Sequence, residues 1–74
     1  MKQAIVKEVE RVGYTYLDHR PLTNHPDDWY LQVVLAKNDR EYVVWLYNAT
    51  TNSLNEGNYL ETEEQAVAAY NSKK

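Results

Sequence analysis

The residues of this chain that could carry out chemistry lie in and beside one loop. They are of types that ligate divalent metals or transfer protons near neutral pH, namely Asp18, His19, His25, Asp27 and Asp28. Their spacing matches neither the HExxH nor the DxDxDG pattern of metal sites, and two prolines in residues 20–28 are typical of a surface loop. We therefore interpret the cluster as a solvated loop and expect no bound metal.

Other catalytic signatures are missing from the sequence as well. The chain has no cysteine to act as a nucleophile, and neither histidine is accompanied by a GxSxG turn. Its two glycines, Gly13 and Gly57, are isolated, so they cannot form a glycine-rich loop that binds phosphate. We expect a protein that is not an enzyme and needs no cofactor.

The composition predicts one small folded domain spanning residues 1–74. The chain is 43% hydrophobic and 26% charged, which is ordinary for a globular protein. Because it has no cysteine, neither a disulfide nor a thiolate metal site can reinforce so small a core, and self-association becomes an attractive source of stability. The first ten residues carry charges within a short apolar pattern, so we expect no signal peptide, no membrane segment and a cytoplasmic location.

The charge pattern bears on the choice of partner. Eight basic and eleven acidic residues give a formal net charge of −3, and the basic residues are scattered along the chain. Clustered lysine and arginine supply most of the non-specific affinity for nucleic acid. The pattern therefore disfavours a nucleic-acid partner.

Two aromatic and β-branched runs predict a β-hairpin in the middle of the chain. They cover residues 29–36 (WYLQVVLA) and 41–48 (EYVVWLYN). A two-residue turn at Asn38 and Asp39 would join them. The residues of the next run, 57–60, follow a polar loop and predict a short third strand.

The turn also predicts which residues share a face of the hairpin. It sets Leu35 opposite Tyr42, and side chains then alternate between the two faces. The first face is continuously apolar and consists of Leu31, Val33, Leu35, Tyr42, Val44 and Leu46.

A helix is predicted at each end of the chain. Thr62 and Gln65 form a capping-box pattern that opens a helix over residues 62–72, whose apolar side would pack on the first face of the sheet. Near the N-terminus, helical spacing links Ile5, Val9, Val12 and Tyr16, and Gly13 would end the helix near residue 12. The alternative is a hairpin of residues 5–11 with 14–17, since the first stretch is rich in β-branched residues.

These elements give an α+β fold. We predict a three-stranded antiparallel meander with a C-terminal helix packed on one face, preceded by an N-terminal helix (α-β-β-β-α). One helix cannot cover both faces of the sheet, which leaves the second face for the N-terminal helix or for a partner.

The second face is the candidate binding surface. The chain has seven Tyr and two Trp but no Phe, and these side chains suit interfaces because they combine apolar area with a polar tip. We expect the surface to bind another protein or a second copy of the chain, with Trp45 at its centre. The alternative is a second core layer under the N-terminal helix. The candidate residues are Tyr30, Val34, Val43, Trp45 and Tyr47.

Residues 57–70 (GNYLETEEQAVAAY) follow a glycine, aromatic, Thr-x-x-(Glu/Gln)-Ala pattern at the start of the predicted C-terminal helix. With the order strand, strand, strand, helix, residues 29–71 resemble the three-stranded-sheet DNA-binding domains of plant ethylene-response factors and of phage integrase arm-binding regions. The resemblance implies an alternative function, nucleic-acid binding through the second face. Those domains use Arg and Trp there, whereas this face has almost no basic residue. With its N-terminal helix the chain also resembles double-stranded-RNA-binding domains in element order.

Overall fold

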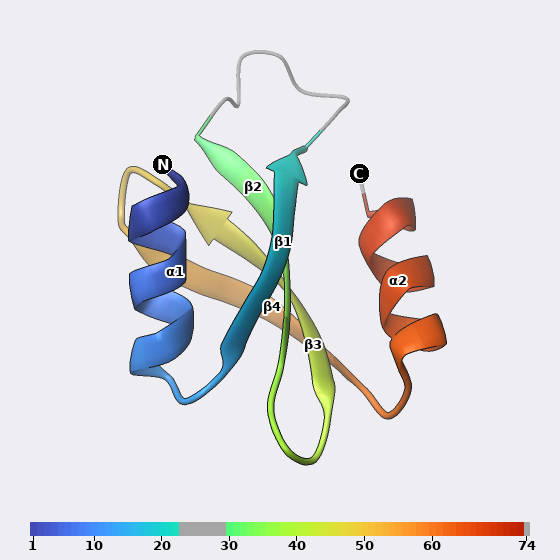
Figure 1. Ribbon diagram of the computed structural model, residues 1–74. Helices are drawn as coiled ribbons and strands as arrows, with labels where there is room; N and C mark the ends of the chain where they lie inside the picture. The colour runs from blue at the N-terminus through green and yellow to red at the C-terminus, as the bar shows by residue number, and fades with distance from the viewer. Residues whose placement is uncertain (23–29, 74) are drawn as a thin grey trace.

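The computed structural model describes residues 1–22 and 30–73, which form two helices and one antiparallel sheet. In chain order the elements are α1 (Lys2–Arg11), β1 (Thr15–Pro21), β2 (Leu31–Lys37), β3 (Tyr42–Asn48), β4 (Ser53–Leu60) and α2 (Glu63–Ser72). The strands lie in the order β1-β2-β3-β4, and α1 and α2 pack on opposite faces of the sheet (Figure 1). Within the described residues, neither helix is long and apolar enough to cross a membrane.

The α+β class and both predicted helices are confirmed, but the prediction of three strands is wrong by one. Thr15–Pro21 forms an edge strand that pairs with β2. A β-bulge at Leu17 interrupts its alternation, so the period-two pattern that reveals a strand is lost. The last strand is also longer than predicted, since it begins at Ser53 within the segment that we had interpreted as a polar loop.

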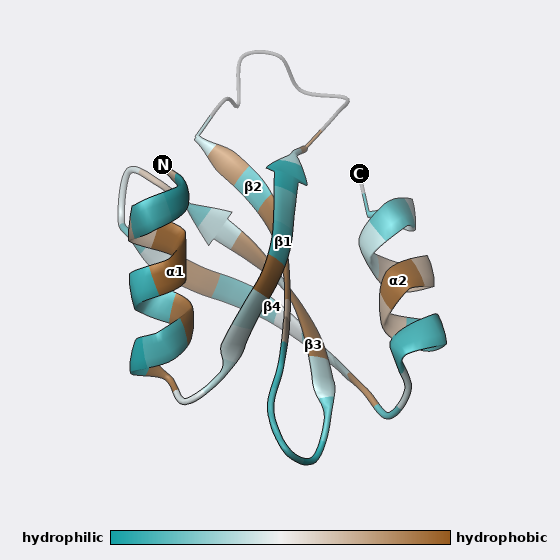
Figure 2. Cartoon of the chain, viewed as in Figure 1, coloured by the Kyte–Doolittle hydropathy of each residue, from teal (hydrophilic) through white to brown (hydrophobic). Residues whose placement is uncertain are grey.

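The N-terminal segment is a helix and not the strand of a hairpin. Its Ile5 and Val9 are completely buried against the sheet, and this burial outweighs the small helix penalty of β-branched residues. The hydrophobic bands of α1 lie on the side turned to the sheet (Figure 2). Gly13 follows with a φ of +90°, a left-handed conformation that glycine adopts without strain. Tyr16, which we had placed on the helical stripe, lies instead in β1.

The β2–β3 hairpin has the predicted faces but a register shifted by two residues. Leu35 lies opposite Val44, and Lys37 lies opposite Tyr42. The connection is therefore a four-residue loop, in which the Asn38 side-chain oxygen accepts the backbone N–H groups of Arg40 and Glu41, both at 2.9 Å. Because side chains alternate with a period of two, a shift of two keeps every residue on its predicted face.

The core has two layers, one on each side of the sheet. On the first face, α2 contributes Ala66 and Tyr70 to a cluster with Val33, Leu35 and Val44, as predicted. On the second face, α1 packs on another cluster, which comprises Ile5, Val9, Val34, Ala36, Val43, Trp45 and Tyr47. A sheet whose two faces are both apolar thus has a helix for each face.

Candidate functional site

The aromatic face that we had predicted as a binding surface is covered by α1. Val34 and Val43 are completely buried, Trp45 exposes 5% of its surface and Tyr47 exposes 2%, while Tyr30 is half-buried. The Tyr47 hydroxyl is hydrogen-bonded within the chain, since it donates to the Asn52 side-chain oxygen at 2.6 Å. In the folded chain this face is a second core layer, and a partner could reach it only if α1 moved away.

The predicted His and Asp cluster divides between β1 and the region outside the described residues. Asp18 accepts the backbone N–H of His19 at 2.8 Å, and the His19 Nδ1 lies 2.6 Å from the Tyr16 hydroxyl. His25, Asp27 and Asp28 belong to residues 23–29, outside the described part of the chain. Among residues 1–22 and 30–73, no three His, Asp or Glu side chains come together in a way that could hold a metal ion.

One edge of the sheet is exposed along most of its length. Strand order places β4 at this edge, where β3 is its neighbour within the described chain. Residues 55–59 are all exposed, and Tyr59 exposes 55% of its surface. Alternate residues of an edge strand direct backbone N–H and C=O groups away from the sheet, and these groups can pair with another strand.

A β-bulge shapes the middle of β4. Val44 lies opposite Asn58 but Leu46 lies opposite Asn55, so Glu56 and Gly57 share one position across from Trp45. Glu56 takes a left-handed φ of +54°. A Cβ on Gly57 would come within 2.8–2.9 Å of the Tyr59 side chain, which shows that the ring lies directly over the glycine. In this conformation the Tyr59 ring occupies the space that a side chain at position 57 would take.

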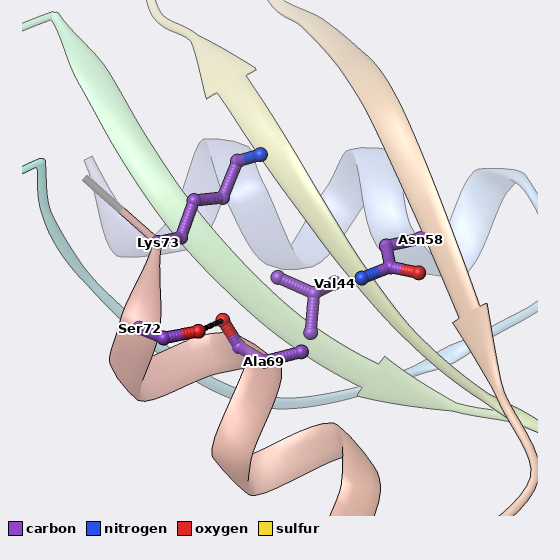
Figure 3. Close-up of a pocket in the computed structure, with 5 residues that line it drawn as sticks. All are labelled: Val44, Asn58, Ala69, Ser72 and Lys73. Atoms are coloured by element: carbon purple, nitrogen blue, oxygen red, sulfur yellow. Dashed lines mark hydrogen bonds between the residues drawn. The ribbon is translucent and has the colours of Figure 1, made fainter.

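A groove runs beside β4 on the face that carries α2. It has a volume of about 220 Å³ and is lined by Val44, Asn58, Ala69, Ser72 and Lys73 (Figure 3). At its mouth the Lys73 ammonium lies 3.9 Å from the Glu56 carboxylate. The groove therefore combines an apolar contribution from Val44 and Ala69 with hydrogen-bonding and charged groups at its border.

The opposite edge of the sheet is less suited to strand pairing. β1 contains a bulge at Leu17 and ends at Pro21, which has no backbone N–H. It carries the charged Arg20, whose guanidinium donates to the Lys73 carbonyl oxygen at the end of α2, at 2.7 Å. Bulges, charges and proline are the features by which natural proteins protect a sheet edge.

A wider hollow of about 460 Å³ lies on the outer surface of α1. Its lining comes from a single helix and comprises Lys2, Gln3, Val6 and Lys7. Ligand sites are usually formed by several elements that enclose the ligand, and this hollow lacks that property.

Comparison of the chain with protein-family models, with curated proteins and with solved structures finds no match. The edge of β4 and its groove were not among the residues that we had predicted as a site. Asn55, Gly57 and Asn58 are typical of loops, and only the pairing of β3 with β4 shows that they form an exposed strand.

Proposed function

We propose that this chain is a small non-enzymatic protein-binding module that accepts an extended segment of a partner along β4. The observation that carries the proposal is the exposed edge of this eight-residue strand. In strand addition, main-chain hydrogen bonds supply affinity, and pockets for alternate side chains supply specificity. The backbone of β4 offers N–H and C=O groups for such main-chain hydrogen bonds.

The groove beside β4 offers a pocket for side chains of an added strand. A strand added to β4 would direct alternate side chains toward the face that carries α2. Val44 and Ala69 offer apolar contact there, and Asn58 and Ser72 offer hydrogen-bonding groups. A volume of about 220 Å³ suits one or two side chains of a peptide and is small for a drug-sized ligand, whose pockets run from about 300 Å³ upward.

Selection from a displayed library of random peptides tests this proposal. We expect the selected peptides to shift the backbone amide resonances of residues 53–60 in NMR titrations. Asn58→Lys places a charge on the β4 edge and should weaken binding about tenfold or more. Leu17→Lys is the matched control, because it places the same charge on the β1 edge and should leave binding unchanged.

Two results would contradict the proposal. One is a selection that yields no peptide with saturable binding to the chain. The other is a set of peptides that bind but shift amides away from β4 and are insensitive to Asn58→Lys.

A further inference from the structure

We infer that the strand which pairs with β4 is β4 of a second copy of this chain, so that two sheets join edge to edge about a two-fold axis. The inference rests on the proposed function, since it names the partner of the same edge. Three observations carry it: the inequality of the two sheet edges, a self-complementary register along β4, and an ion pair beside the bulge.

The β4 edge is open to strand pairing and the β1 edge is protected, and this difference determines the kind of assembly. If both edges were open, β4 of one copy could pair with β1 of the next, and the chain would form open-ended fibres. The bulge at Leu17 and the proline at position 21 disfavour that contact. Pairing of β4 with itself uses the open edge of each copy and closes after two chains, as isologous interfaces do.

The bulge in β4 limits the registers in which the strand can pair with itself. On β4, Ser53, Asn55, Asn58 and Leu60 point to the face of α2, whereas Leu54 and Tyr59 point to the face of α1, as their β3 neighbours show. The bulge changes the alternation between Asn55 and Asn58. In an antiparallel pair, residues opposite each other must share a face.

Placing Asn55 opposite Asn58 of the second copy satisfies this rule for the six residues of β4 whose faces the pairing with β3 defines. Leu54 then lies opposite Tyr59 of the second copy on one face, and the two asparagine pairs can form amide hydrogen bonds on the other. Shifting the strands by one residue would place Leu54 opposite a residue of the wrong face. The strand is therefore complementary to itself in a register that uses its whole length.

The charge at the bulge fits the same arrangement. In this register Glu56 faces Gly57 of the second copy, so the two Glu56 carboxylates approach the two-fold axis. Like charges across a strand pair are destabilising unless they are neutralised. Each copy supplies Lys73 for this purpose, with its ammonium 3.9 Å from its own Glu56 carboxylate.

Reversal of this charge tests the inference in solution. Glu56→Lys places two positive charges at the axis, beside the Lys73 ammonium of each copy. We expect the dissociation constant of the dimer, measured by sedimentation equilibrium, to rise about tenfold or more. In a mixture of the variant with the unaltered chain, the heterodimer has only one Glu56 carboxylate for the Lys73 ammonium groups of both copies, so its dissociation constant should lie between those of the two homodimers. Glu10→Lys, an equal change of charge on exposed α1, is the matched control and should have no effect.

Cysteine crosslinking tests the register, and the chain has no other cysteine to interfere. Asn55→Cys and Asn58→Cys variants should form a disulfide when mixed and oxidised, because these positions face each other across the axis. Each variant alone should crosslink much less, since Asn55 does not face Asn55 and Asn58 does not face Asn58.

The outcomes separate this inference from the proposed function. A chain that stays monomeric at all concentrations, or a dimer that is indifferent to Glu56→Lys, overturns the pairing of β4 with itself. If selected peptides still bind β4 in that case, the proposed function stands and the partner is a different protein. If neither peptides nor a second copy engage β4, both are wrong.

Discussion

Arg20 holds the end of α2 through Tyr70. Its guanidinium lies over the Tyr70 ring, 5.3 Å from the centroid, and donates hydrogen bonds to the carbonyl oxygens of Tyr70 and Lys73. The last carbonyl groups of a helix have no partner within the helix, and a cation there also suits the negative end of the helix dipole. An arginine on the edge strand β1 thus anchors the end of a helix through residues 50 and 53 positions away in sequence.

Removal of this side chain should loosen α2. We expect Arg20→Ala to lower the free energy of unfolding by about 1–3 kcal/mol, because hydrogen bonds from a charged donor and a cation–π contact are lost together. Hydrogen exchange should accelerate in the last turn of α2. Arg20→Lys keeps the charge but not the planar guanidinium, so its free energy of unfolding should lie between those of Arg20→Ala and the unaltered chain. If Arg20→Ala leaves unfolding and exchange unchanged, the contact is not a stabilising one.

The two helices and the faces of the β2–β3 hairpin could be predicted from the sequence because both depend on local periodicity. Burial of Ile5 and Val9, and the capping of α2 by Thr62, follow patterns within a few residues. The side-chain oxygen of Thr62 accepts the Gln65 N–H at 3.2 Å, as the capping pattern predicts.

The hairpin register and strand β1 could not be predicted, because they depend on details that the periodicity does not encode. Asn38 accepts two backbone N–H groups and so favours a four-residue loop over the two-residue turn. The bulge at Leu17 conceals the alternation of β1. The exposed edge of β4 is a property of strand order, which arises from long-range pairing and leaves no local pattern in residues 53–60.

The Tyr14 phenol should make stability depend on pH in the alkaline range. Its hydrogen bond to the Glu41 carboxylate, together with burial, raises the pKa of Tyr14 from 10.0 to about 12. Because the folded state holds this proton more tightly than the unfolded state, the contribution is fully present below pH 10 and is lost as the pH rises toward 12. Tyr14→Phe should therefore lose less stability across this interval than the unaltered chain.

Glu41→Gln is the matched control for that effect. Glutamine can still accept the hydrogen bond but carries no negative charge, so the pKa of Tyr14 should fall toward its ordinary value. The measurement is the absorbance of tyrosinate during alkaline titration, combined with urea unfolding at each pH. Burial also raises the pKa of Tyr70, to about 12. Part of the loss of folding stability at alkaline pH should therefore persist in both variants. An unchanged titration in Tyr14→Phe would contradict the assignment.

Gly57 and Tyr59 should behave as a coupled pair. Gly57→Ala would place a methyl group 2.8–2.9 Å from atoms of the Tyr59 ring, which must then turn away. Since the ring is exposed and free to rotate, we expect a loss of about 1 kcal/mol or less. The loss should shrink in a Tyr59→Ala background, and a double-mutant cycle measures the difference. Additive effects of the two substitutions would show that the ring does not oppose the methyl group.

Substitutions at Trp45 and at Tyr59 should affect folding stability and self-association differently. Trp45 is buried under α1 and makes an edge-to-face contact with the Tyr14 ring, with 5.0 Å between the ring centroids. Trp45→Ala should therefore cost about 3–5 kcal/mol of folding stability as a core truncation. Tyr59 lies exposed on β4, and Tyr59→Ala should change folding stability by less than about 1 kcal/mol while weakening the self-association of the chain. Urea unfolding and sedimentation of both variants give the comparison. If Trp45→Ala folds normally but fails to associate, the aromatic face under α1, rather than the edge of β4, is the binding surface.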